Sequence, residues 1–288
     1  MLADFFAQHS STLLILLCTL LCIAAVMHPQ IRRRWRQKQL LATPFPAHWR
    51  HILRQQWPIY RRLPTDLQLR LKKHIQLFLL EKKFVGCDGL EVNDEMRVLI
   101  AAQACLLTLK RPTPHYPDLS TILLYPQAFT VKTPQASQGI VNEQAHVRLG
   151  ESWSHGEVVL SWPHSQAGAV DAEDGHNLVF HEFAHQLDQQ TGQANGAPAL
   201  PNAASYQAWS AHFSKAFEAL RQQIAQQQPT FLDPYAATNP AEFFAVATET
   251  FFEKPHEFSQ VYPAIYQLMR EFYQLDPQYW QPTTSPQH

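Results

Sequence analysis

NLVFHEFAHQLD, residues 177–188, is the stretch from which the fold and the chemistry of this chain can be worked out, because it contains the pattern H-E-x-x-H. Successive residues of an α-helix turn by about 100°, so His181 and His185 project from one face a turn apart, and their imidazoles can converge on one metal ion. Phe183 and Leu187 lie on a neighbouring stripe that suits a hydrophobic core. The stretch therefore predicts an amphipathic helix that buries one side and presents the other to a cleft.

Glu182, between the two histidines, is the candidate catalytic acid–base group. In a site of this kind the glutamate is not a ligand: it takes a proton from zinc-bound water and passes it to the leaving nitrogen. Zinc suits two imidazoles and lowers the pKa of its water to about 7. The pattern favours a zinc metallopeptidase that hydrolyses peptide bonds with one zinc ion per chain. Two histidines on a helix can also be solvated or hydrogen-bonded in a core, and the motif alone leaves this alternative open.

A third protein ligand has to come from another part of the chain. The metzincin pattern H-E-x-x-H-x-x-G-x-x-H fails, because Asp188 and Thr191 stand where glycine and histidine are required. Glu242 is the strongest downstream candidate, since it opens a helix expected at 240–252 whose other face is apolar. The same glutamate can instead close a capping box with Asn239 as N-cap, and the residues alone leave both roles open.

Further polar residues near these positions have weaker expected roles. Tyr235 can donate a hydrogen bond to the oxyanion that forms when water attacks a peptide carbonyl, or it can simply pack. Asp188 is a candidate partner for the second nitrogen of a ligating histidine, or an exposed residue at the helix end. For Glu249 and Glu253 we expect a solvated acidic edge. The strand-like segment EVVLSW, 157–162, can pair with an extended peptide or belong to the core.

The first segment of the chain has the composition of a membrane anchor. No Asp, Glu, Lys or Arg occurs between Asp4 and Arg32, and the apolar stretch within 5–31 approaches the ~20 residues that a bilayer-spanning helix needs. A cleaved signal peptide would carry its basic residues before the apolar run, whereas here RRRWRQK, 32–38, follows it. We therefore expect a single-pass anchor at 1–30 in the inner membrane, with the body of the protein in the cytoplasm.

Composition and charge restrict the possible partners. With 288 residues and 45% hydrophobic content the chain can bury a core, which excludes disorder throughout. The net charge is −1, yet 14 of the 23 Lys and Arg lie at or before Lys83, where only three acidic residues occur, a surplus of eleven. Beside an apolar span, anionic lipid is the expected partner of this surplus, and we expect no direct binding of nucleic acid. Cys87 and Cys105 have neither CxxC nor zinc-ribbon spacing, which suits reduced thiols in the cytoplasm.

The rest of the chain predicts one α+β domain. We expect a basic juxtamembrane segment and linker at 31–47, the domain at 48–280 and a disordered tail at 281–288. Periodicity and caps predict further helices, and branched and aromatic residues predict strands. The expected helices besides 177–188 and 240–252 are 65–84, 93–110, 205–227 and 262–274, and the expected strands are 121–131 and 157–162. Strands grouped in mid-chain, with helices before and after, favour α+β over a wound parallel sheet.

Four ordered segments resemble a known family, the zinc peptidases typified by the bacterial Mlc titration factor A. They are GLEVNDEMRVLIAAQACLL (89–107), RLGESWSHGEVVLSW (148–162), NLVFHEFAHQLD (177–188) and PYAATNPAEFFAVATETFF (234–252), and the resemblance runs from about residue 60 to 275. It implies a zincin-like domain, a small sheet with surrounding helices, similar to the catalytic domain of anthrax lethal factor.

The resemblance also implies roles for individual residues. His181 and His185 match the histidine ligands of the family, Glu242 its third zinc ligand, Glu182 its catalytic glutamate and Tyr235 its transition-state tyrosine. It implies a peptide or protein substrate, cleaved by an aminopeptidase or a limited endopeptidase. The expected anchor departs from the family, whose typical member is soluble. A second hypothesis is a membrane-tethered protein that sequesters a transcriptional repressor, with a structural or vestigial metal site.

Overall fold

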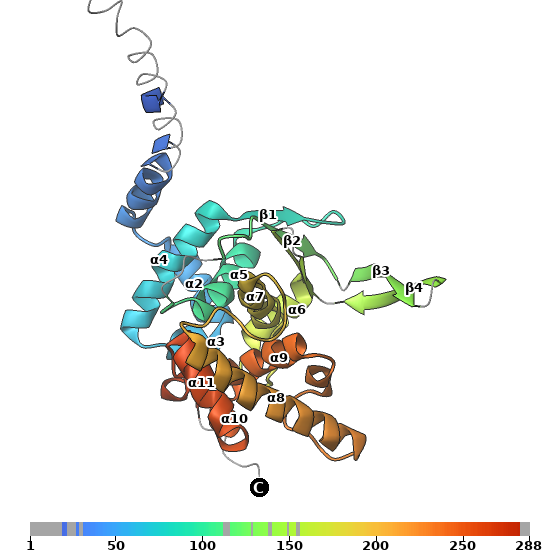
Figure 1. Ribbon diagram of the computed structural model, residues 1–288. Helices are drawn as coiled ribbons and strands as arrows, with labels where there is room; N and C mark the ends of the chain where they lie inside the picture. Colours follow the sequence, from blue (N-terminus) through green and yellow to red (C-terminus); the bar gives the residue numbers. More distant parts are fainter. Residues whose placement is uncertain are drawn as a thin grey trace, which may run out of the picture. The chain divides into compact units, whose positions relative to one another are not determined.

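The computed structural model describes residues 19–21, 27–28, 31–111, 116–127, 129–137, 140–148, 150–153 and 156–282. The chain divides into two compact units, 1–44 and 45–288, which are described separately. In the first unit, residues 31–42 are helical (Figure 1). The anchor expected at 5–31 lies almost entirely outside the described residues, as does 283–288 of the expected tail. No helix that the structure describes has both the length and the apolar character needed to span a bilayer.

The second unit contains a small mixed sheet. Its strands, in spatial order, are β1 (Lys83–Gly86), β2 (Thr121–Tyr125), β6 (Glu157–Ser161) and β5 (Gly150–Trp153). The first three are parallel, and β5 is antiparallel to β6. A separate antiparallel hairpin is formed by β3 (Phe129–Ser137) and β4 (Ile140–Arg148), so the single strand expected at 121–131 is in fact two strands (Figure 1).

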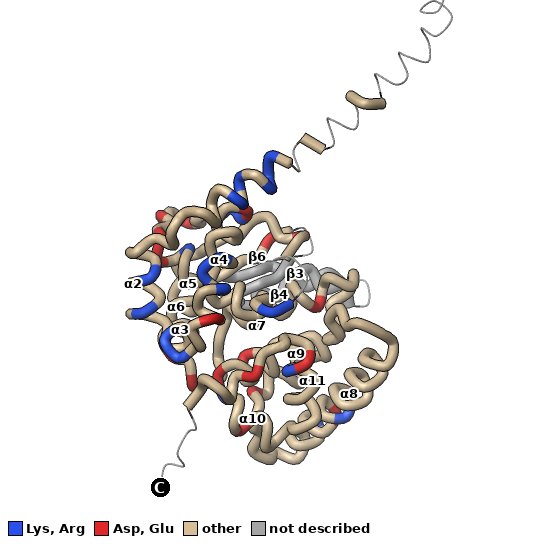
Figure 2. Tube along the Cα trace, turned by 90° about the vertical axis from the view of Figure 1, so that its left-hand side faces the viewer, with Lys and Arg blue, Asp and Glu red and all other residues tan. Residues whose placement is uncertain are grey.

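Helices account for most of this unit, and together with the small sheet they are compatible with the α+β class (Figure 1). They are α2 (Ala47–Gln56), α3 (Pro58–Arg62), α4 (Thr65–Glu81), α5 (Asp94–Leu107), α6 (Trp162–Val170), α7 (Leu178–Asp188), α8 (Ala203–Ala225), α9 (Pro240–Glu253), α10 (Pro255–Val261) and α11 (Pro263–Tyr273), with short 3-10 turns η1 (Gln189–Thr191), η2 (Pro234–Ala237) and η3 (Pro277–Tyr279). Lys and Arg gather on α2, α3 and α4, as the sequence predicts for the N-terminal half (Figure 2).

The helix expected at 65–84 ends three residues early, because a strand begins there. Lys82 has an extended backbone, and its buried ammonium donates to the carbonyl oxygens of Tyr116 at 2.6 Å and Leu119 at 2.7 Å. The next residue, Lys83, pairs through its N–H with the Ser120 carbonyl, 2.9 Å away. The ammonium thus holds the segment before β2 against the end of α4, and β1 starts alongside it.

Helix α7 lies at the centre of the unit, in contact with α5, α9 and β5 (Figure 1). Phe183 is fully buried, with its ring centre 4.8 Å from that of Tyr116 and 5.9 Å from that of Phe78. On the side toward α9, Phe180 packs against Phe252 at 5.2 Å. Aromatic pairs of this geometry contribute beyond the area they bury. The apolar stripe expected on this helix is confirmed, and it fixes the rotation of α7 so that the histidines face away from these rings.

Candidate metal centre

The start and end of α7 are set by its flanking residues. The Asn177 side chain accepts a hydrogen bond from the Phe180 N–H at 2.9 Å, as an N-cap does. The helix ends at Asp188, passes through η1 and stops at Gly192, whose φ of 101° is the left-handed conformation that favours glycine. Together these residues place His181 in the first turn and a half of the helix.

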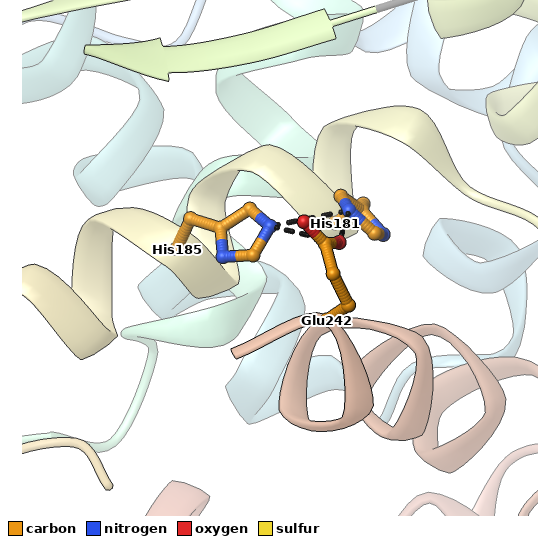
Figure 3. Close-up of side chains that lie close together, drawn as sticks. All are labelled: His181, His185 and Glu242. Atoms are coloured by element: carbon orange, nitrogen blue, oxygen red, sulfur yellow. Dashed lines mark hydrogen bonds and ion pairs between the residues drawn. The ribbon is translucent and has the colours of Figure 1, made fainter. Parts of the chain in front are cut away.

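The start of α9 brings Glu242 to the histidines. Asn239 is the N-cap, and its side chain accepts from the Glu242 N–H at 3.0 Å, with Pro240 as the first helical residue. The capping alternative is therefore half right, because the backbone of Glu242 is capped. Its carboxylate, however, points across to α7, between His181 and His185 (Figure 3).

Three possible ligand atoms meet at this point. His181 Nε2 lies 2.9 Å from Glu242 Oε2 and 3.2 Å from His185 Nε2, and His185 Nε2 lies 3.3 Å from Glu242 Oε2. Tetrahedral zinc with bonds of roughly 2.0–2.1 Å would separate its ligand atoms by about 3.3 Å, so the cluster has the dimensions of a zinc site. The side chains of His181, His185 and Glu242 are 13%, 11% and 16% exposed, so solvent reaches the cluster to a small extent.

Charge in the cluster is strongly coupled. Burial alone would lower the pKa of His181, but hydrogen bonds to Glu242 and Glu249 outweigh it and raise that pKa well above its usual value. Burial would raise the pKa of Glu242, and the hydrogen bonds to His181 and His185 reverse this and lower it. Glu242 is therefore an anion. A metal ion that binds at this point has to displace a proton from His181.

A second carboxylate supports His181 from behind. The Nδ1 atom lies 2.8 Å from Glu249 Oε1, and Glu249 Oε2 accepts from the Asn177 backbone N–H at 2.5 Å. Glu253 follows one turn later and accepts from the Asn177 side-chain amide at 2.9 Å and from the Gly175 N–H at 3.1 Å. The solvated acidic edge expected for these two glutamates is wrong, since they are 6% and 3% exposed. They tie α9 to the start of α7.

The three remaining candidate residues, Glu182, Tyr235 and Asp188, differ in how far they are exposed to solvent. Glu182 is 4% exposed, and its negative charge contributes to the raised pKa of His181. Tyr235, in η2, is 53% exposed with its ring centre 6.0 Å from that of His181. Asp188 is fully buried, and its Oδ2 accepts from the Gly196 N–H at 2.7 Å. In the described part of the chain Asp188 thus holds a loop and makes no hydrogen bond to a histidine of the cluster, which corrects both roles considered for it.

The sheet edge also differs from expectation. EVVLSW contains β6, which has β2 on one side and β5 on the other, so it is no edge. The edge strand on this side is β5, and it lies against α7. The core interpretation of 157–162 is the correct one, since Val158 and Leu160 are fully buried.

A helical unit with a small mixed sheet, an H-E-x-x-H helix and a glutamate from a second helix together define the metallopeptidase class. The comparison with known families agrees: residues 32–274 match the glucose-regulated metallo-peptidase M90 family, and this chain belongs to it.

Known proteins with similar sequences support this family membership. An uncharacterized protein of Synechocystis sp. is 45% identical over 245 residues, which cover 84% of this chain and 89% of that protein. Mlc titration factor A of Escherichia fergusonii is 34% identical over 224 residues, and that of Klebsiella pneumoniae (strain 342) is 35% identical, each alignment covering 76% of this chain and 83% of the relative. The resemblance inferred from the four sequence segments is thereby confirmed.

Proposed function

We propose that this chain is a zinc metallopeptidase that binds one zinc ion through His181, His185 and Glu242 and hydrolyses peptide bonds. The observation that supports it most is the meeting of three ligand atoms from α7 and α9 within 4.8 Å of one another. Two imidazoles and a carboxylate are the donor set of zinc sites that leave one position open for catalysis. The same donors also bind other divalent ions, so the choice of zinc is part of the proposal.

In the proposed reaction, Glu182 takes a proton from the attacking water and delivers it to the leaving nitrogen. When bound, zinc supplies Lewis-acid polarisation of the water and of the scissile carbonyl. Tyr235, exposed beside His181, donates its hydroxyl to the oxyanion. Glu249 holds the His181 ring by accepting from Nδ1, which leaves Nε2 for the metal.

For substrate binding, the edge strand β5 is the candidate in place of 157–162. An extended peptide can add to a free sheet edge through main-chain hydrogen bonds, and β5 lies against the helix that holds the histidines. This arrangement fits a peptide or protein substrate, and it is compatible with either an aminopeptidase or a limited endopeptidase.

We further propose that the protein is a single-pass protein of the inner membrane with its peptidase domain, 48–280, in the cytoplasm. The support is the apolar composition of 5–31 and the basic segment 32–38 that follows it. Lys and Arg on α2, α3 and α4 continue this basic character into the domain (Figure 2).

A regulatory function is the second candidate, because several relatives carry the name Mlc titration factor A. In this alternative the chain sequesters a transcriptional regulator at the membrane, and the metal site only stabilises the fold. A pull-down with wild type and His181→Ala tests it. Retention of a regulator irrespective of metal, without cleavage of any peptide, would favour this alternative.

The proposed peptidase is tested on the full chain purified in detergent. Metal analysis should find about one zinc ion per chain, and a peptide library should be cleaved. Glu182→Gln keeps the size of the side chain and the three ligands, so it should retain the metal while hydrolysis falls by roughly 10²-fold or more. Full activity of Glu182→Gln would exclude the proposed mechanism, and absence of bound metal in wild type would exclude the site.

A further inference from the structure

A second site lies between α8, α11 and the loop at 199–201. It is a cavity of about 270 Å³, lined mainly by apolar side chains, among them Leu200, Trp209, Leu268 and Phe272. None of its lining residues belongs to the metal centre. Its volume is slightly below the range of roughly 300–1,000 Å³ that is typical of small-molecule sites.

One positive charge lines this apolar cavity. Arg111, just after α5, is 8% exposed, and its guanidinium carbon lies 3.9 Å from the centre of the Phe272 ring. Its Nη1 atom is buried without a hydrogen-bond partner in the structure, and no carboxylate among the described residues forms an ion pair with it. A guanidinium remains protonated in proteins, so Arg111 is a buried cation that stacks on a ring and has no counter-ion in the described part of the chain.

The groups that face Arg111 do not neutralise it. The charges of Tyr273 and Tyr116 would influence the pKa of Arg111, but both are buried phenols with a raised pKa and hence uncharged. Their hydroxyls are also engaged, with the Ala104 carbonyl and with the Thr248 hydroxyl, each at 2.8 Å. The cost of burying the charge is therefore only partly offset by the ring contact.

Among the residues that the structure describes, one acidic side chain lines the cavity. Glu271 is exposed at the rim, and its Oε1 accepts from Gln267 Nε2 at 2.6 Å on the same helix. The remaining polar lining, Ser205 and Gln274, is neutral. An anion with an apolar body would thus meet Arg111 and several apolar walls inside the cavity, with the negative charge of Glu271 at the exposed rim.

We propose that this cavity binds a small monocarboxylate with an apolar or aromatic body, the carboxylate pairing with Arg111 and the body lying against Trp209 and Phe272. A planar guanidinium binds a carboxylate more specifically than an ammonium does, because two parallel N–H donors match the two oxygens. The pairing would supply a counter-ion that none of the described residues provides. This inference does not depend on the proposed peptidase activity.

The cavity has a structural connection to α7. Trp209, on its wall, donates through Nε1 to the Gly196 carbonyl at 2.8 Å, and the Gly196 N–H donates to Asp188 at the end of α7. The site is thus separate from the metal centre but built on the same framework. A probe that binds the metal instead has to be distinguished by the experiment.

The test uses the full chain in detergent and three probes: 3-phenylpropanoate, its uncharged analogue 3-phenylpropanol, and inorganic phosphate. Binding is followed by the ligand-induced rise in Tm and by Trp fluorescence. We expect a saturable effect of the carboxylate, weaker binding of the alcohol by about tenfold or more, and no saturable effect of phosphate. Equal binding of the alcohol, or of phosphate, would overturn the proposal.

Four variants locate the site. Arg111→Met keeps a side chain that can pack on Phe272, and it should weaken the binding of 3-phenylpropanoate by about tenfold or more. Lys110→Met removes a neighbouring charge outside this cavity, and it should change the binding by less than about twofold. Leu268→Trp fills the cavity and should abolish binding, which decides the case if Arg111→Met does not fold. Undiminished binding in Arg111→Met or Leu268→Trp, or loss of binding in His181→Ala, would assign the probe to another site.

Discussion

The Nδ1 atom of His181 lies 2.8 Å from Glu249 Oε1, while Nε2 of the same ring faces Glu242. The ring is therefore held from both sides by carboxylates of one helix, seven residues apart. An acceptor at Nδ1 fixes the tautomer with its free electron pair on Nε2, which is the form that binds a metal. Since Glu249 also accepts from the Asn177 N–H, the start of α7 and the orientation of the ring are fixed together.

Glu249→Gln should weaken metal binding without removing a ligand. The amide presents a donor to either His181 Nδ1 or the Asn177 N–H, so one of the two contacts is lost and the ring is less well oriented. Loss of such a partner typically costs about 10–100-fold in metal affinity. The measurement is a zinc competition titration against a chelator. Glu253→Gln is the matched control, because Glu253 has no contact with the ring, and equal affinities in the two variants would refute a positioning role.

Tyr235→Phe tests the hydroxyl that we assign to the oxyanion. The side chain is 53% exposed, so its Tm and zinc content should match those of wild type. Removal of one donor to an oxyanion costs about 10²–10³ in kcat, and KM should change little. Tyr279→Phe is the control, since Tyr279 is 83% exposed and lies on η3. A kcat for Tyr235→Phe equal to that of this control would remove Tyr235 from the mechanism.

The sequence predicted that His181, His185 and Glu242 come together, but it did not predict the carboxylates that support them, for a geometric reason. The spacing of His181 and His185 and the cap at Asn239 are local signals, and the structure places them where expected. Glu249 lies on the same face of α9 as Glu242 but about 10 Å further along the axis, which suggested solvent exposure. Only the crossing of α7 over α9, a tertiary property, sets the His181 ring between the two carboxylates.

The dependence on tertiary contacts also explains why the sequence predictions for the sheet were wrong. EVVLSW was recognisable as a strand from its composition, but its neighbours β2 and β5 are set by long-range pairing, so its interior position could not be predicted. β1 was hidden inside a helical pattern because Lys82 and Lys83 continue the helix in composition. The interactions that end the helix come from Tyr116 and Leu119, more than thirty residues away.

Phe183→Ala should destabilise the whole domain. The side chain is fully buried between Phe78 and Tyr116, and truncation leaves a cavity that the surrounding aromatic rings cannot fill. Such truncations cost about 3–5 kcal/mol. Denaturant unfolding followed by circular dichroism gives the value, with Leu69→Ala as control, since Leu69 on α4 is 53% exposed and its loss should cost within about 0.5 kcal/mol. A loss below about 1 kcal/mol for Phe183→Ala would contradict the central place of α7 in the core.

Glu253→Gln should change how stability depends on pH. Burial raises the pKa of Glu253 well above its usual value, the Asn177 amide lowers it, and the charges of Asp174 and Glu249 raise it further. As pH rises above about 4.3, the usual pKa of a glutamate in an unfolded chain, the unfolded state loses this proton before the native state does. The native state then binds more protons than the unfolded state, so the free energy of unfolding falls as pH rises, by at most about 1.4 kcal/mol per pH unit. Glutamine cannot ionise. The stability of wild type minus that of Glu253→Gln should therefore decrease from pH 5 to pH 8, as measured by urea unfolding at each pH. Glu218→Gln, at an exposed position on α8, is the control, and its free energy of unfolding should differ from that of wild type by the same amount at every pH. If the difference for Glu253→Gln were also constant, Glu253 would be ionised in the native state throughout this range.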